Sequence, residues 1–145
     1  PRLDPLGYGS VIAKFMTQAL RGEPLTVYDN GKQTRCFTYV GDTIEGTIRA
    51  ATVKEAVGQV FNIGSNRESS IIELARLIRE LTGTTSEIAH IPYEVAYGKQ
   101  FEETRRRVPD ITRAREILGF EAQTTLEEGL PKTLAWFRDS ASWTD

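Results

Sequence analysis

The sequence has few of the residues that build disulfides and metal sites. Its 145 residues include one cysteine, Cys36, and one histidine, His90. A single cysteine excludes an internal disulfide and is compatible with a reducing compartment. A single histidine argues against a zinc site with Cys and His ligands, and we expect no metal. No neighbour in the sequence marks either residue as activated, so we expect both to have structural roles.

Long apolar runs and a strong charge of one sign are also missing. No apolar run approaches the length of a membrane-spanning helix, and nothing behind Pro1 resembles the apolar part of a signal peptide. The net charge of -2 argues against nucleic acid or a membrane as the main partner. The hydrophobic fraction of 39% is ordinary for a globular protein. We therefore expect one cytoplasmic domain over residues 1–145.

Helical periodicity and capping residues divide the chain into short elements. Helices are predicted over 11–20, 42–52, 71–81, 112–118 and 126–138. Strands are predicted over 25–28, 35–40, 59–63 and 87–91, with the first two joined by a turn into a hairpin. Capping boxes are expected for Asp42 with Glu45, Ser70 with Glu73, and Thr125 with Glu128. Residues 92–107 are expected to form a long functional loop.

The order of these elements indicates a mixed α/β fold. Two strand–helix units suggest contact with a larger parallel sheet that is not contained in this chain. The absence of an initiator Met suggests a cut edge at Pro1. We expect pieces of a Rossmann sheet, without the N-terminal half of that fold.

Two short segments resemble functional motifs of NAD-dependent dehydrogenases. Gly7 and Gly9 resemble the start of a dinucleotide loop, but no strand precedes them and Ile12 stands where the third glycine should be. Tyr28 and Lys32 have the spacing of a catalytic Tyr-x-x-x-Lys pair, which needs one helical face. The turn between them removes that face, so we expect neither motif to function.

Arginines provide the candidate binding chemistry. A diphosphate favours two guanidinium groups, whose planar forks match phosphate oxygens. Arg35 follows a turn at the start of a predicted strand, and three arginines in succession occupy 105–107. A solubility charge on an edge strand would also account for Arg35. A solvated charge run would account for 105–107, so both interpretations stay open on the residues alone.

A series of short motifs in a characteristic order favours the binding interpretation of these arginines. They are Pro1-Arg2, Gly22 to Tyr28, Gly31, Gln33 to Arg35, Tyr39-Val40, Asp42, Phe61 to Gly64, Arg107, Pro109 to Ile111, Leu118 to Phe120, and Leu126 to Leu130. Together they resemble the C-terminal part of the extended short-chain dehydrogenase/reductase family. Its members are NAD-dependent nucleotide-sugar epimerases, decarboxylases and dehydratases. The resemblance covers nearly the whole chain.

The resemblance implies roles for individual residues. Arg35 matches the family arginine that binds the nucleotide diphosphate. Arg107 best matches the second phosphate-binding arginine, with Arg106 as the alternative. The substrate-binding set that the resemblance implies is Arg35, Arg107, Arg106, Gln33, Tyr28 beside the nucleotide base, and Val11 and Ile12, whose backbone meets it. Arg2 belongs to the segment that links the sugar and cofactor halves.

The resemblance also implies what this chain does not do alone. The family's NAD loop and catalytic residues would precede Pro1, so we expect positioning of substrate and no turnover. The parent enzyme is expected to be a homodimer that uses NAD on a UDP-sugar. A 4-epimerase is the first expectation, and a UDP-glucuronate decarboxylase or dTDP-glucose 4,6-dehydratase is the alternative. A non-enzymatic nucleotide-sugar-binding module and a truncated product without function are the remaining hypotheses.

Overall fold

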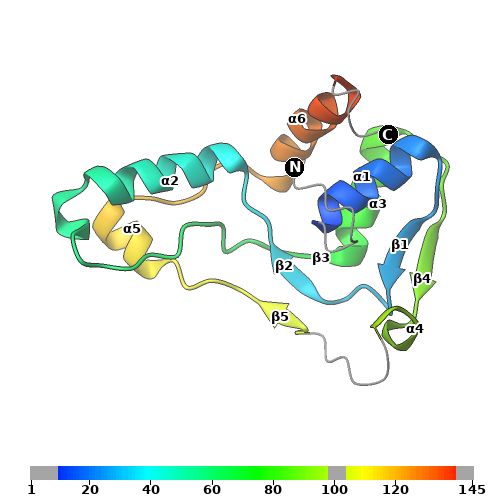
Figure 1. The fold of residues 1–145 in the computed structure, drawn as a ribbon, viewed down its shortest axis with the longest axis horizontal. Coiled ribbons are helices and arrows are strands. Elements are labelled where there is room, and N and C mark those ends of the chain that lie inside the picture. Colours follow the sequence, from blue (N-terminus) through cyan, green and yellow to red (C-terminus); the bar gives the residue numbers. More distant parts are fainter. Residues whose placement is uncertain (1–9, 98–103, 140–145) are drawn as a thin grey trace. The chain divides into compact units, whose positions relative to one another are not determined.

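The computed structural model describes residues 10–97 and 104–139. In chain order the helices are α1 (Val11–Arg21), α2 (Val40–Thr52), η1 (Lys54–Ala56), α3 (Ile71–Thr82), α4 (Tyr93–Tyr97), α5 (Thr112–Leu118) and α6 (Leu126–Asp139). The strands are β1 (Leu25–Tyr28), β2 (Thr34–Cys36), β3 (Glu68–Ser70), β4 (Ile88–Ile91) and β5 (Arg106–Arg107). Figure 1 shows this mixture of helices and short strands, which confirms the predicted α/β class.

The chain forms two compact units. The first contains residues 1–33, 70–104 and 130–145, and the second contains 34–69 and 105–129. The Gly7–Gly9 motif and Arg2 lie outside the described residues.

The first unit is built on one pair of parallel strands. β1 pairs with β4 from Leu25 opposite Ile88 to Tyr28 opposite Ile91, and Figure 1 shows the two strands side by side. Helices α1 and α3 contact each other and β1. The largest fully buried side chains of this unit are Phe15, Phe137, Met16, Leu25, Leu74, Ile78, Leu130 and Val27. Burial of these groups stabilises the unit because apolar surface leaves water.

Local capping defines ends of helices α1 and α3 in the first unit. α1 ends at Gly22 and α3 ends at Gly83, both with a positive φ near 70° that glycine adopts at low cost. The Ser70 hydroxyl accepts from the backbone N–H of Glu73, and the Glu73 carboxylate accepts from the backbone N–H of Ser70. This capping box is the one predicted from the sequence.

The second unit contains a three-stranded sheet and a small apolar cluster. The strand order is β3-β2-β5, and β2 pairs with β5 in parallel. Buried Ala56, Ala114, Leu118, Phe120 and Ala122 form the cluster. Phe61 and Ile63 pack against it, although residues 59–63 do not form the strand that was predicted. Their apolar pattern is therefore satisfied by packing on this cluster, without the ladder of a strand.

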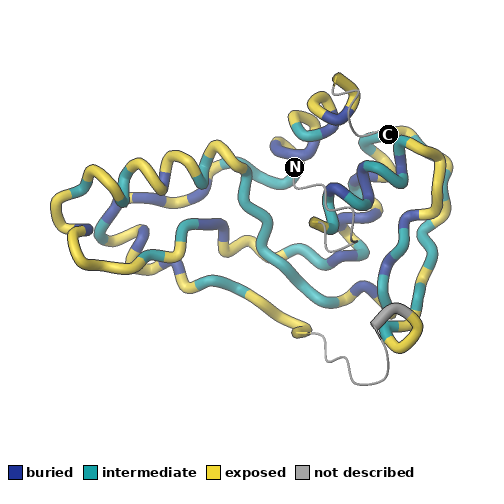
Figure 2. Tube along the Cα trace, viewed as in Figure 1, coloured by how far each residue is buried: buried dark blue, intermediate teal, exposed yellow. Residues whose placement is uncertain are grey.

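One face of α2 remains open to solvent in this unit. Val40, Ile44 and Ile48 are four residues apart and are 63%, 54% and 53% exposed. Figure 2 shows exposed residues along much of this helix. Side chains at this spacing share one helical face, so the exposed apolar groups form a stripe.

The predicted hairpin over residues 25–40 is wrong. β1 takes β4 as its partner, and β2 belongs to the other sheet. The turn at Asp29 to Gly31 does form, with a positive φ at both of those residues. A turn reverses the chain locally, but the choice of pairing partner depends on the rest of the fold.

Two further predictions need correction. α2 begins at Val40, before the predicted Asp42 cap, and Asp42 instead accepts from the backbone N–H of Thr124. The predicted loop over 92–107 contains α4 and the two residues of β5. By contrast, α5 ends before Gly119, and Thr125 with Glu128 makes the expected capping box. No helix in the described ranges is long and apolar enough to cross a membrane.

Candidate functional site

The arginine candidates lie on two neighbouring strands of the second unit. In the parallel pairing of β2 with β5, Thr34 lies opposite Arg106 and Arg35 lies opposite Arg107. The backbone N–H of Thr34 donates to the carbonyl of Arg105 at 2.9 Å and fixes this register. Side chains of opposed residues share one face of a sheet, and the next pair takes the other face. The register therefore separates Arg106 from Arg107.

The face that carries Arg106 is occupied by an ion pair. Nη2 of Arg106 lies 2.7 Å from a carboxylate oxygen of Glu68, and its Nε also donates to that carboxylate at 3.1 Å. The Thr34 hydroxyl donates to the same carboxylate at 2.8 Å. The bond from Arg106 and then the bond from Thr34 lower the pKa of Glu68, and the carboxylate raises the pKa of Arg106. The guanidinium of Arg106 is therefore already paired with a carboxylate of the same sheet.

The opposite face brings Arg35 and Arg107 together. Arg35 is half-buried, and its Nη1 donates to the carbonyl of Thr34 at 2.7 Å. Arg107 is exposed. Neighbouring strands are about 4.8 Å apart, so the two cationic side chains begin close together. An anion with several oxygens would relieve the repulsion between them and match both guanidinium forks.

Cys36 has no sign of activation. It is partly buried at the end of β2, two residues after Thr34 and therefore on the face that carries Glu68. Burial first, and then the negative charge of Glu68, raise the pKa of its thiol above the ordinary value, against a smaller opposite effect of Arg106. A raised pKa leaves less thiolate at neutral pH, which agrees with the predicted structural role.

The base-binding candidate Tyr28 lies at the carboxyl end of β1 in the first unit. Nζ of Lys14 donates to its hydroxyl at 3.1 Å and lies 4.6 Å from its ring centroid. The ring of Tyr93 lies 5.6 Å from that of Tyr28, centroid to centroid, with an angle of 31° between planes. Tyr28 is thus held by Lys14 and Tyr93, and it shares no helix with Lys32, as predicted.

Gln33 is joined to the same aromatic group. Its Nε2 donates to the hydroxyl of Tyr93 at 2.8 Å, and its backbone carbonyl accepts from Ile71. The backbone N–H of Tyr93 donates to Oδ1 of Asp29, whose carbonyl lies 2.7 Å from Nδ1 of His90. A carbonyl only accepts, so Nδ1 carries the proton. This bond gives His90 the structural role that was expected.

Tyr93, which contacts both Tyr28 and Gln33, was not among the residues predicted from the sequence. It fell inside a predicted loop of weak periodicity, although it directly follows a strand and a proline. Residues just beyond the carboxyl end of a parallel strand often contact ligands, so this position was the available signal.

Val11 and Ile12 form the first turn of α1 and are half-buried. Ser10 makes no side-chain capping bond, and the first backbone N–H groups of a helix have no intrahelical acceptor. The predicted contact of Val11 and Ile12 with a nucleotide base is not tested by these features and stays a prediction.

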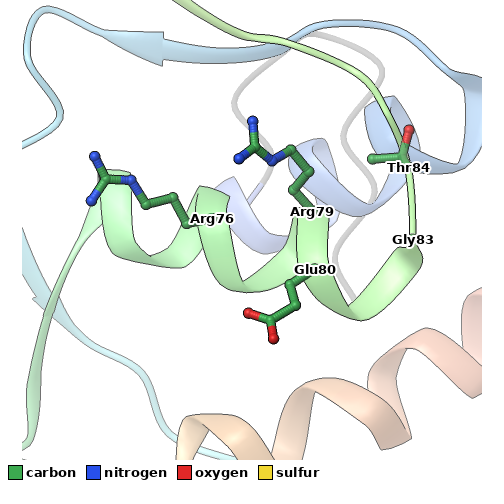
Figure 3. Close-up of a pocket in the computed structure, with 5 residues that line it drawn as sticks. All are labelled: Arg76, Arg79, Glu80, Gly83 and Thr84. Carbon is green, nitrogen blue, oxygen red and sulfur yellow. The ribbon is translucent and has the colours of Figure 1, made fainter.

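Two surface depressions lie elsewhere. One, of about 440 Å³, is lined by Arg76, Arg79, Glu80, Gly83 and Thr84 at the end of α3. Figure 3 shows Arg79 and Glu80 on opposite sides of that helix. The other, of about 480 Å³, is lined by Asp42, Glu45, Arg49, Arg115, Gly119, Phe120, Glu121 and Gln123. Neither contains a residue of the predicted site. Within the described residues, no three His, Cys, Asp or Glu side chains form a group that could hold a metal ion.

Comparison with known proteins gives a consistent picture. A family model described as GDP-mannose 4,6 dehydratase matches residues 2–133. A curated relative from Bacillus cytotoxicus, named UDP-N-acetyl-alpha-D-glucosaminuronate decarboxylase, is 45% identical over 139 residues. That match covers 96% of this chain and 43% of the relative. The chain thus spans less than half the length of this relative.

Solved structures agree with the sequence relatives. A UDP-glucose 4-epimerase from Thermotoga maritima, in complex with UDP-glucose, has a TM-score of 0.82 and 34% identity, covering 95% of this chain and 42% of the other. A UDP-glucuronic acid 4-epimerase from Bacillus cereus, in complex with UDP-glucuronic acid and NAD, has a TM-score of 0.80 and 27% identity. The alignment with this epimerase covers 95% of this chain and 41% of the epimerase.

Proposed function

Because this chain belongs to the extended short-chain dehydrogenase/reductase family, in the group described as GDP-mannose 4,6 dehydratase, we propose that it is the part of such an enzyme that binds the nucleotide-sugar. The diphosphate of a UDP-sugar would bind between Arg35 and Arg107. The observation that carries this proposal is their opposed position on β2 and β5. The two related epimerase structures with UDP-sugars support the choice of ligand.

Arg107 is the better second arginine because Arg106 is already engaged. A guanidinium that gives two donors to Glu68 has fewer left for phosphate, and its charge is partly neutralised. Arg107 lies on the face of Arg35 and is exposed. The register thus supports the first of the two assignments made from the sequence.

NAD is the cofactor of this family, and several solved relatives contain it. When bound, NAD accepts a hydride from the sugar reversibly. The described residues contain no glycine-rich turn from a strand into a helix that would fit its pyrophosphate. Their contribution would be the binding energy of the nucleotide, realised away from the reacting carbon.

The overall reaction has two candidates. Structural similarity to two 4-epimerases favours epimerisation, the first expectation from sequence. The 45% identity to a UDP-sugar decarboxylase favours decarboxylation. Release of CO₂ from UDP-glucuronic acid or from UDP-N-acetylglucosaminuronic acid, assayed with NAD on the full-length enzyme that contains this chain, separates the two, since epimerisation leaves the carboxylate in place.

Calorimetry with UDP tests the diphosphate site. Arg35→Ala and Arg107→Ala should each weaken UDP binding by about tenfold to a hundredfold, the usual effect of losing hydrogen bonds to a charged group. Pyrophosphate should compete with UDP, and added salt should weaken both. Arg115→Ala is the matched control, because Arg115 is an exposed arginine of the same unit on α5. No binding at millimolar UDP, or equal effects of all three variants, would sink the proposal.

A further inference from the structure

The backbone that carries Arg107 is held by the sheet over a very short length. β5 has two residues, and Arg107 is the second of them. Val108 and Pro109 follow, and proline has no backbone N–H to donate to a neighbouring strand. The course of the chain beyond Arg107 therefore depends on the next residue that is fixed from outside this segment, which is Asp110.

The side chain of Asn62 fixes the backbone of Asp110. Its Nδ2 donates to the carbonyl of Asp110 at 2.9 Å. Oδ1 of Asp110 in turn accepts from the backbone N–H of Thr112 at 2.9 Å, where α5 begins. Asn62 and Asp110 are 48 positions apart in the sequence, so this bond joins two distant segments of the second unit.

The segment that carries Asn62 is itself well anchored. Phe61 and Ile63, on either side of Asn62, pack against the apolar cluster of this unit. Oε1 of Gln59 accepts from Nη2 of Arg113, and Cζ of Arg113 lies 5.7 Å from the centroid of the Phe61 ring. A donor on an anchored segment restricts its acceptor more than a donor on a mobile side chain does. The bond from Asn62 therefore transmits the position of the cluster to Asp110.

We propose that Asn62 is a positioning residue that keeps Arg107 opposite Arg35 for binding of the nucleotide diphosphate. It acts through the carbonyl of Asp110, three residues after Arg107, and contacts no phosphate itself. All four residues belong to the second unit. A segment that is ordered before the ligand arrives has less freedom to lose on binding, so affinity rises. This inference rests on the proposed function, because it assumes that a diphosphate binds between the two arginines.

Calorimetry with UDP on the 145-residue chain tests this role. Asn62→Leu keeps a side chain of similar shape but removes the donor, and Asn62→Ala is the second variant if leucine disturbs folding. Each should weaken UDP binding by about threefold to tenfold, the effect of one neutral hydrogen bond. Pyrophosphate binding should weaken by the same factor. Asn66→Ala is the matched control, because Asn66 is an exposed asparagine of the same unit, and it should leave both affinities unchanged.

A double-mutant cycle separates positioning from a purely structural role. If Asn62 acts through Arg107, adding Asn62→Leu to Arg107→Ala should cause no further loss of UDP affinity. Adding it to Arg35→Ala should still cause the full loss, since Arg107 remains to be positioned. A purely structural Asn62 would lower the unfolding midpoint and leave UDP affinity unchanged, or would lower that affinity equally in both backgrounds. Either of these results overturns the inference.

The outcomes also distinguish the inference from the proposed function. If Arg35→Ala and Arg107→Ala weaken UDP binding while both Asn62 variants leave it unchanged, the role of Asn62 is wrong and the diphosphate site stands. If the unchanged chain does not bind UDP at millimolar concentration, both proposals fail.

Discussion

The guanidinium of Arg106 and the carboxylate of Glu68 form a close ion pair with three donor–acceptor contacts between 2.7 and 3.1 Å. This pair lies on the face of β2 and β5 opposite to Arg35 and Arg107. Two consecutive, exposed arginines therefore have different environments, since Arg106 is paired with Glu68 and Arg107 lies on the face of Arg35. The alternation of a strand makes this difference, and it has a consequence for binding.

We expect Arg107→Ala to weaken UDP binding much more than Arg106→Ala does. The first substitution removes a proposed phosphate ligand, at a cost of about tenfold or more. The second breaks an exposed ion pair, and such pairs contribute little, so UDP affinity should change by less than about threefold. Calorimetry at one fixed salt concentration measures both. A larger effect of Arg106→Ala would assign the contact to Arg106 and reject the register argument.

Local signals in the sequence predicted the helices well. The helices predicted over 11–20, 71–81 and 112–118 end within two residues of the predicted bounds, before Gly22, Gly83 and Gly119, which all adopt the left-handed conformation that ends a helix. The capping boxes at Ser70 and Thr125 were likewise predicted and form. These features depend on residues three or four positions apart, so a single sequence contains the information.

Pairing between distant residues was not predictable in the same way. β1 pairs with residues 88–91, far along the chain, so the nearby turn misled the hairpin prediction. Asp42 failed as a cap because its carboxylate binds Thr124, 82 residues away. The arginine run showed the same limit: its residue types indicated phosphate binding, but only the β2–β5 register separates Arg106 from Arg107.

Ser70→Ala should destabilise the chain by about 1 kcal/mol at neutral pH, the usual cost of losing a helix cap. The backbone N–H and hydroxyl of Ser70 both donate to the Glu73 carboxylate, and the cap also satisfies the N–H of Glu73. Thermal unfolding followed by circular dichroism at pH 7 measures the loss. Ser10→Ala is the control, because Ser10 is the exposed N-cap of α1 and makes no side-chain capping bond.

The same pair gives the effect of Ser70→Ala a pH dependence. The backbone bond and then the hydroxyl bond from Ser70 lower the pKa of Glu73 below the ordinary 4.5. Because the folded pKa is below the unfolded one, this stabilisation is present above 4.5 and is lost as the pH falls through the folded pKa. Alanine keeps the backbone N–H, so only the contribution of the hydroxyl bond differs between the two chains, and the difference in unfolding midpoint between the unchanged chain and Ser70→Ala should narrow modestly below pH 4.5. A difference that is constant from pH 7 to pH 3 would contradict this account.

Gly46→Ala should destabilise the second unit although it replaces glycine by the best helix former. In an exposed helix interior this change gains up to about 1 kcal/mol. Gly46 is buried in α2, however, and a Cβ there would overlap Cγ2 of Ile63 and lie 3.1 Å from the Phe120 ring. Phe120 belongs to the packed apolar cluster, so it cannot move freely. Overpacking of this kind costs about 1–3 kcal/mol.

Thr47→Ala is the control variant for Gly46→Ala, because it places alanine at an exposed position of the same helix. Thr47 is exposed on the same helix, so its replacement should leave stability within about 0.5 kcal/mol or raise it slightly. Urea unfolding of the two variants gives the free energies directly. If Gly46→Ala were as stable as Thr47→Ala, α2 would not be packed against Ile63 and Phe120 in solution. If only Gly46→Ala is destabilised, the close approach at this glycine is what joins α2 to Ile63 and the apolar cluster.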